Sequence, residues 1–224
     1  MKEIKVLDHG YVRLVDSMGS DLSVVRSARV SYNADWRVGD DAGSDTRLIN
    51  YLWRNRHTTP FESVTFTFEI KAPIFIFRQW HRHRTWSFNE ISGRYTELTE
   101  EFYVPEPDKI GKQSIVNKQV RVLIEERDML IPSMIDHACS AAFEAYRTLL
   151  AHEVPRELAR SILPLATYSR MFATVNLLNL LKFINLRDHP HAQYEIQLYG
   201  KALASFVKEV CPTTYEAFDA HRNT

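Results

Sequence analysis

The sequence has little cysteine, no excess charge and no long hydrophobic run. Its two cysteines, Cys139 and Cys211, stand far apart, which disfavours a disulfide scaffold or a thiolate metal site and predicts a reducing, cytoplasmic location. Lys and Arg number 28 and Asp and Glu number 28, so the overall charge lacks the basic excess typical of nucleic-acid-binding proteins. No apolar run is long enough to span a bilayer and no signal pattern opens the chain, so we expect no membrane contact.

The remaining composition is that of a globular protein. The 224 residues are 45% hydrophobic and 25% charged, enough to build one sizeable core. No repeat, low-complexity tract or linker divides the chain. We therefore expect one domain over residues 1–224.

The pattern of apolar residues predicts an α+β fold, with an antiparallel sheet and a largely helical C-terminal half. Residues 3–17 alternate on either side of Asp8-His9-Gly10 and predict a hairpin, and Val64–Ile70 and Met171–Val175 predict strands. Asp21 is expected to cap a short helix, residues 33–44 to form a loop, and Asp45 to begin a helix. Further helices are expected over Pro73–Arg84, Asn117–Asp128, Ile131–His152, Pro155–Leu163, Leu177–Leu186 and Ala192–Val210.

The segment Arg82–Arg94 carries the strongest functional signal. It holds three arginines, and Glu90 is the only acid between Lys71 and Glu97. Arginine binds phosphate or carboxylate oxygens through two parallel hydrogen bonds, and a glycine such as Gly93 lets an anion approach the backbone. The segment therefore predicts a site for a small phosphorylated molecule.

Two alternatives compete with that interpretation. Basic clusters are commonly solvated faces, or nucleic-acid patches in which aromatic residues, here Trp80, Trp86 and Phe88, stack on bases. The neutral net charge argues against a nucleic-acid patch, and Asn89 and Glu90 supply hydrogen-bonding groups that backbone binding alone does not need.

Three other polar clusters are weaker. The run from His57 to Glu62 includes Thr59-Pro60, which commonly caps a helix. The run from Pro155 to Arg160 places two arginines on one helical face, where Glu157 can form a surface ion pair. Asp188, His189 and His191 suggest a metal-dependent phosphohydrolase, but their spacing is not that of a metal motif, and no metal is predicted.

Taken in order, these segments resemble the flavin-dependent thymidylate synthases, ThyX. The ThyX signature is Arg-His-Arg, seven residues, then Ser and a terminal Arg, which matches Arg82-His83-Arg84 followed by Ser92-Gly93-Arg94. The similarity includes the blocks His57–Glu62, Arg78–Trp80, Pro155–Arg160, Asn185–Arg187 and Ala192-Gln193. It runs from about residue 4 to residue 218.

The resemblance implies an enzyme that converts dUMP to dTMP with methylenetetrahydrofolate as one-carbon donor and NADPH-reduced FAD as hydride source. It also implies a homotetramer with shared active sites. The implied dUMP residues are Gln79, Arg82, Glu90, Ser92, Gly93, Arg94 and Arg187, with Arg160 from a neighbouring subunit. The implied FAD residues are Ser31, Thr59, Glu62, Arg82, His83, Arg84, Asn89, Glu90, Asn176, Lys182 and His191.

Three of these residues carry the expected catalysis. Arg187 is expected at the uracil edge, where it stabilises charge on the ring oxygens, and His57 near flavin and folate. Ser92 is expected to orient or polarise the base, because an unassisted serine is a weak nucleophile. The chain departs from the family pattern at Leu178, often arginine, and at Lys182, often asparagine; both positions usually hold the adenine half of FAD.

Overall fold

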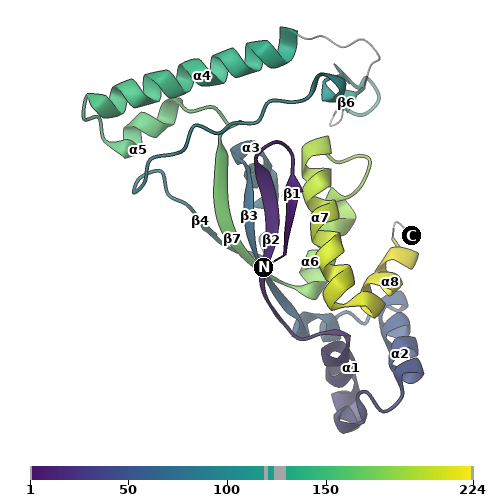
Figure 1. The fold of residues 1–224 in the computed structure, drawn as a ribbon. Helices are drawn as coiled ribbons and strands as arrows, with labels where there is room; N and C mark the ends of the chain where they lie inside the picture. Colours follow the sequence, from purple (N-terminus) through teal and green to yellow (C-terminus); the bar gives the residue numbers. More distant parts are fainter. Residues whose placement is uncertain (1, 119–120, 124–129, 223–224) are drawn as a thin grey trace.

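One antiparallel sheet of five strands organises the molecule. The computed structural model describes residues 2–118, 121–123 and 130–222. The strand order is β1-β2-β3-β7-β4 (Figure 1). The strands are β1 (Glu3–Val6), β2 (Gly10–Met18), β3 (Thr65–Pro73), β7 (Tyr168–Asn176) and β4 (Ser87–Glu90).

The predicted hairpin and the two predicted strands are confirmed. Val6 pairs with Gly10 across the turn, and β3 pairs along its whole length with β7, from Thr65 opposite Asn176 to Pro73 opposite Tyr168. Every second residue of β3, from Phe66 to Ile70, is completely buried, as the alternation predicts. Strand β4 lies within the basic segment and was not predicted, because its four residues are too few for a periodic signal.

Two helices cover one face of the sheet and complete the main core. These are α6 (Leu177–Arg187) and α7 (Tyr194–Val210), both predicted, and their apolar faces pack on β3 and β7 (Figure 1). Phe206 of α7, for example, lies with its ring centroid 5.8 Å from that of Phe68. The opposite face of the sheet is polar, and there Arg13 forms an ion pair with Glu69.

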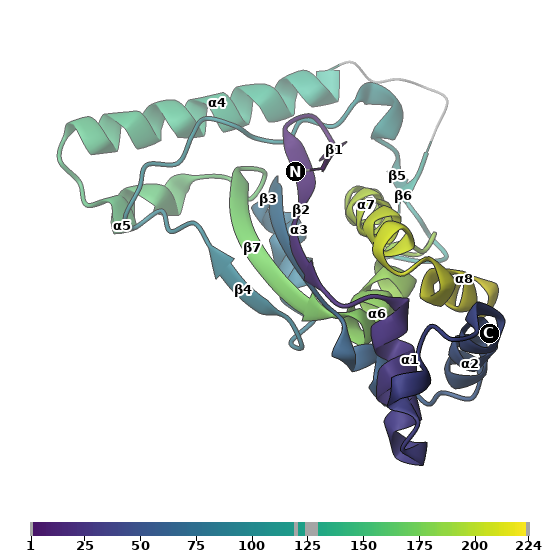
Figure 2. The ribbon, with the colours of Figure 1, turned by 60° about the horizontal axis from the view of Figure 1, so that its bottom comes forward.

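Helices α1 (Asp21–Arg29), α2 (Ala42–Arg54) and α8 (Pro212–Ala220) gather at one end (Figure 2). The predicted capping role of Asp21 is wrong, because Ser20 caps α1. Asp21 instead accepts hydrogen bonds from the backbone N–H groups of Thr213 and Thr214, both at 2.9 Å, and so closes the first turn of α8, which was not predicted.

The predicted start of the second helix at Asp45 is also wrong. The helix α2 begins at Ala42 and is capped by Asp41, whose side chain accepts from the backbone N–H groups of Gly43 and Ser44. Asp45 is buried instead and forms an ion pair of 2.6 Å with Arg29 of α1. The predicted loop over residues 33–44 is therefore shorter and contains a 3-10 turn, Asp35–Arg37.

At the other end, α4 (Leu130–Ala151) crosses above the sheet and extends past its edge (Figures 1 and 2). Its buried residues form a small second core with the short helix α5 (Arg156–Ala159). The predicted helix over Pro155–Leu163 continues after α5 as a 3-10 turn, Arg160–Ile162. None of the helices in the described ranges has the length and apolar character that a membrane crossing requires.

The predicted helix over Asn117–Asp128 is wrong where it can be compared. Arg121–Val122 form a strand, β6, which pairs with β5 (Lys112–Gln113) in a small hairpin near the amino-terminal end of α7 (Figure 1). Residues 119, 120 and 124–128 of that prediction lie outside the described residues. The paired residues of this hairpin are mostly polar, so the sequence showed no alternation that would indicate a strand.

Candidate functional site

The basic segment begins where α3 (Ile74–Trp80) ends. The predicted helix is confirmed but stops at Trp80, whose ring packs edge-on against that of Trp86 at 5.7 Å. Both tryptophans are buried, and between them Arg82 and Arg84 are exposed whereas His83 is half-buried. The stacking of nucleic-acid bases on Trp80 or Trp86 is therefore ruled out, which removes a main support of the nucleic-acid alternative.

At the centre of the site, Arg187 joins the basic segment to the carboxyl end of α6. Its Nε donates to Nε2 of His83 at 3.0 Å, and its Nη2 donates to the backbone oxygen of Gln79 at 3.2 Å. These residues are 104 and 108 positions away in sequence. Two of the three guanidinium nitrogens are thus held by the protein, and among the described residues no hydrogen bond is made by Nη1.

The His83–Arg187 contact has a definite electrostatic state. Burial, and then the positive charge of Arg187, together lower the pKa of His83 to about 4. Burial also lowers the pKa of Arg187. Since His83 is neutral at neutral pH and accepts through Nε2, its proton is on Nδ1.

The end of α6 that carries Arg187 is held by a residue near the carboxyl end of the described chain. Arg222 forms an ion pair of 2.8 Å with Asp188 and donates to the backbone oxygens of Asp188 and Ile184. Asp188 is therefore engaged with a cation. Among the described residues, no group of three or more histidine, cysteine or acidic side chains is arranged to hold a metal ion.

A second set of contacts leads from Gln79 into the protein. The Nε2 of Gln79 donates to Oε1 of Gln193 at 2.6 Å, and Nε2 of Gln193 donates to Oε2 of Glu195 at 2.8 Å. Glu195 also binds Arg121 of β6 and the hydroxyl of Tyr103. Gln193 belonged to a recognised block, but Glu195 and Arg121 gave no functional signal in the sequence.

The Ser92-Gly93-Arg94 end of the segment lies against α5. A Cβ at Gly93 would stand 3.1 Å from Cδ of Arg160, so the glycine lets the two come close. Arg94 forms an exposed ion pair of 3.3 Å with Glu157, and its backbone N–H donates to the Ser92 hydroxyl at 3.3 Å. Four predicted dUMP residues thus lie together: Ser92, Gly93, Arg94 and Arg160. Arg160 comes here from the same chain as the other three.

Glu90 links β4 to the neighbouring strand. Its Oε1 accepts from the Ser169 hydroxyl at 2.6 Å, and His81 lies 4.0 Å from its other oxygen. Ser169 was not among the predicted site residues. The hydrogen bond fixes Glu90 at the start of the Ser92-Gly93-Arg94 loop.

Most of the predicted flavin residues are exposed and have side chains without a described polar partner. Among the described contacts, no side-chain hydrogen bond or ion pair involves seven of them: Ser31, Thr59, Glu62, Arg82, Arg84, Asn89 and Lys182. Asn176 caps α6, accepting from Asn179, and the ring of His191 lies 4.8 Å from that of His189. Leu178, one of the departures, is buried in the core.

His57, the third predicted catalytic residue, lies apart from the Arg187 contacts. Its side chain is exposed, and its ring meets that of Tyr51 edge-on at 5.8 Å. It precedes the 3-10 turn Thr59–Ser63, which leads into β3. The structure thus groups the residues around Gly93 and those around Arg187, and leaves His57 exposed.

Comparison with known proteins shows the family to which the chain belongs. Residues 13–213 match the family model described as thymidylate synthase complementing protein. The chain belongs to this family. Its similarity to the flavin-dependent thymidylate synthases, inferred from the Arg82–Arg94 signature, is thereby confirmed.

Relatives that carry that name span nearly the whole chain. The flavin-dependent thymidylate synthase of Thermotoga neapolitana is 49% identical over 216 residues, which cover 96% of this chain and 94% of the relative. That of Thermus thermophilus is 47% identical over 220 residues, which cover 97% of this chain and 78% of the relative. Family membership therefore extends beyond the signature to the whole α+β fold.

A solved structure has the same fold. The UMP/dUMP methylase PolB of Streptomyces cacaoi, solved with 5-Br dUMP bound, superposes with a TM-score of 0.87 at 38% identity and covers 99% of both chains. A second structure of PolB, solved with 5-Br UMP bound, also gives a TM-score of 0.87, at 39% identity. These likenesses confirm the α+β fold class.

Proposed function

We propose that the protein methylates dUMP to dTMP, with methylenetetrahydrofolate as one-carbon donor and NADPH-reduced FAD as hydride source. The observation that carries the proposal is the Arg187–His83–Gln79 contact, which joins the signature residue His83 to residues of two other matching blocks. The names of the relatives and the dUMP analogue bound to PolB support the same reaction.

The phosphate of dUMP would lie at the Ser92-Gly93-Arg94 loop. Gly93 lies close to Arg160, and among the described residues no hydrogen bond engages the backbone N–H groups of Ser92 and Gly93, so these groups could bind the phosphate together with Arg94 and Arg160. Arg94 would exchange its exposed partner Glu157 for the phosphate, because an exposed ion pair of this kind stabilises the protein by no more than about 1 kcal/mol. The prediction that a neighbouring subunit's Arg160 reaches the phosphate remains a proposal beside this same-chain arrangement.

The uracil ring would lie against Arg187. The Nη1 of Arg187 can donate to a ring oxygen of uracil. The positive charge of Arg187 stabilises the electron density that gathers on that oxygen as C5 forms its new carbon–carbon bond. Neutral His83 accepts from Nε, so it directs the guanidinium without adding a competing positive charge. Ser92 would orient the nucleotide through its hydroxyl, and Glu90, fixed by Ser169, would accept from the sugar or base.

The exposed polar residues fit FAD. Arg82 and Arg84 have no acidic partner among the described residues, so they are free to bind the pyrophosphate, and Asn89 can hydrogen-bond the ring. When bound, FAD supplies the hydride that completes the methyl group. Exposed Lys182 would supply positive charge near the adenine half, where buried Leu178 cannot. His57 would lie near flavin and folate.

The resemblance also suggests a homotetramer with shared sites. Large apolar side chains are exposed along α4 and its neighbours, including Leu130, Met134, Leu158 and Leu165. Apolar surface of this extent commonly marks an interface. A sedimentation mass of four chains is expected, and a single-chain mass at the enzyme's working concentration would contradict it. A cytoplasmic location fits the two free, buried cysteines.

The reaction can be tested directly. The protein is incubated anaerobically with dUMP, methylenetetrahydrofolate and NADPH, with and without FAD, and the nucleotides are separated by chromatography. We expect dTMP that depends on FAD, whether added or co-purified. If a folded, FAD-loaded protein binds dUMP but forms no dTMP, the catalytic proposal fails and a nucleotide-binding module becomes the better interpretation.

A further inference from the structure

A row of hydrogen bonds connects Glu195, in the first turn of α7, to Gln193 and then to Gln79. The Glu195 side chain is 1% exposed although it bears a carboxylate. One oxygen accepts from Nη2 of Arg121 at 2.7 Å and from the Tyr103 hydroxyl at 3.1 Å, and the other accepts from Nε2 of Gln193 at 2.8 Å. Since a buried carboxylate is costly to leave unpaired, these donors fix its position.

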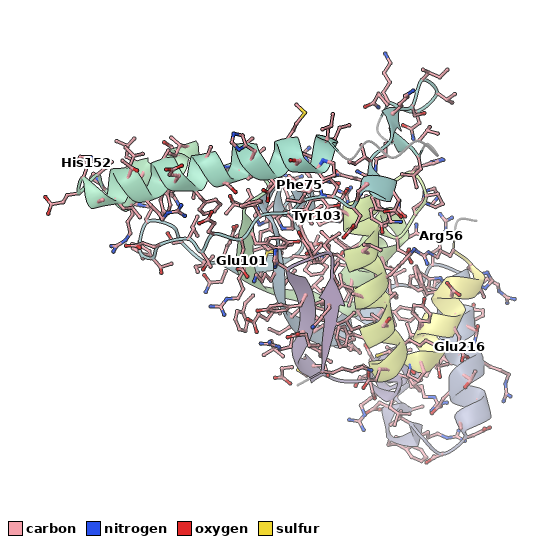
Figure 3. All side chains as sticks on the ribbon, turned by 45° about the horizontal axis from the view of Figure 1, so that its top comes forward. Arg56, Phe75, Glu101, Tyr103, His152 and Glu216 are labelled. Carbon is pink, nitrogen blue, oxygen red and sulfur yellow. The ribbon has the colours of Figure 1, made fainter. Side chains whose placement is uncertain are left out.

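The donors around Glu195 are themselves constrained. Figure 3 labels Tyr103 beside the amino-terminal end of α7. Burial, and then the charge of Glu195, raise the pKa of Tyr103, so its hydroxyl keeps the proton that it donates. Arg121 reaches the site from β6 and lies over the Tyr194 ring, 5.4 Å from its centroid.

The hydrogen bonds have a direction that the carboxylate imposes. A carboxylate in an ion pair only accepts, so Gln193 must turn its NH2 group toward Glu195 and its oxygen toward Gln79. Gln79 must then turn its own NH2 group toward Gln193, which it does at 2.6 Å. The side-chain oxygen of Gln79 is left without a donor among the described residues, beside the contact that its backbone oxygen makes with Arg187.

We propose that Glu195 and Gln193 are positioning residues that orient the amide of Gln79, so that its oxygen accepts a hydrogen bond from the nucleotide. The inference rests on the proposed function, because it takes dUMP as the ligand. The phosphate of dUMP offers oxygen acceptors, whereas its nucleoside offers two donors, the uracil N3–H and the sugar 3′-hydroxyl. The oxygen of Gln79 therefore accepts from the nucleoside part, while the arginines bind the phosphate.

The test measures binding, by calorimetry on the FAD-loaded protein. The ligands are dUMP, an analogue methylated at N3 and an analogue without the 3′-hydroxyl. The variants are Gln193→Met, which breaks the row, and Glu195→Gln, which lets the amides run either way. Gln197→Met is the matched control, because Gln197 lies on the same helix and donates to the Ala192 backbone outside the row.

In the wild type, we expect one analogue to bind about tenfold more weakly than dUMP, the effect of one hydrogen bond, and that analogue identifies the donor. In Gln193→Met, dUMP should bind about tenfold more weakly and the difference between dUMP and that analogue should fall below about twofold. If the N3-methylated analogue binds weakly only because its methyl group clashes with the protein, its weak binding would persist in Gln193→Met. A clash is thereby distinguished from a lost hydrogen bond. KM for dUMP should rise more than kcat falls, and Gln197→Met should behave as wild type.

Three results would overturn the inference. If the wild type binds dUMP but neither analogue loses affinity, Gln79 accepts nothing from the nucleoside. If Gln193→Met keeps wild-type affinities for all three ligands, the row does not orient Gln79. If the wild type binds no dUMP, the proposed function fails and the inference fails with it. Gln193→Met decides the matter even if Glu195→Gln does not fold, because it leaves the Arg121–Glu195 ion pair in place.

Discussion

Mild acid should destabilise the folded protein through His83. The pKa of this histidine is lowered from its ordinary value of 6.5 to about 4 by burial and by Arg187. Between these two values the unfolded chain binds a proton that the folded chain refuses, so the free energy of unfolding falls as pH falls through 6.5 toward 4. Protonation would also remove the acceptor that holds Nε of Arg187.

The size of the effect follows from that difference in pKa. If the whole lowering of the His83 pKa contributed, the free energy of unfolding would be about 2 kcal/mol smaller at pH 5 than at pH 7.5. Because the His83 ring is only half-buried, solvent screening reduces this to about 1 kcal/mol. Other groups titrate over the same range, so the measured quantity is the difference between the wild type and His83→Gln, which keeps an acceptor near Arg187.

Urea unfolding at both pH values measures this difference. The wild type should lose about 1 kcal/mol more than His83→Gln between pH 7.5 and pH 5. His152→Gln is the control, since His152 lies exposed at the far end of α4 (Figure 3), and it should follow the wild type. Equal losses in the wild type and His83→Gln would refute the assignment of His83 as a neutral acceptor.

Three further predictions concern side-chain substitutions. Ser92→Ala should lower kcat yet keep some turnover, and complete loss with intact dUMP binding would contradict a merely orienting or polarising role for the hydroxyl. Cys139→Ala with Cys211→Ala should keep dTMP formation, since both thiols are buried and burial raises the pKa of Cys211 to about 12; an inactive but folded double variant would contradict this. Asp21→Ala should lower the free energy of unfolding by about 2 kcal/mol, because it leaves the first turn of α8 and the buried Thr214 hydroxyl without an acceptor; a change below about 0.5 kcal/mol would be against the capping role.

Local patterns predicted the elements whose periodicity was strong. The alternation in Val64–Ile70 and the apolar faces of residues 131–152, 177–186 and 192–210 each correspond to an observed strand or helix. Caps were harder to predict, because an acidic side chain can serve a nearby or a distant helix. Asp21 stands at the start of α1 but binds residues 192 and 193 positions away.

The candidate site was predicted in parts. The signature indicated the residues from Arg82 to Arg94, since their arginines and Gly93 can bind an anion and Asn89 and Glu90 add hydrogen-bonding groups. Which of them meet could not be predicted, because no local rule joins His83 to Arg187 over 104 residues. Glu195 could not be found at all, because a single acid at the start of an amphipathic helix is typical of ordinary helix capping.

The contacts of Arg222 with the end of α6 affect the order in which parts of the protein form during synthesis. A domain folds as its residues leave the ribosome, from the amino-terminal end onward. Helix α6 is synthesised before Arg222, so Arg187 can meet His83 and Gln79 early, but the ion pair of Arg222 with Asp188 can form only when nearly all of the described chain has emerged. A nascent chain can therefore form α6 before Asp188 is held by Arg222, and this ion pair is completed together with the last residues of the main core, such as Phe218 of α8.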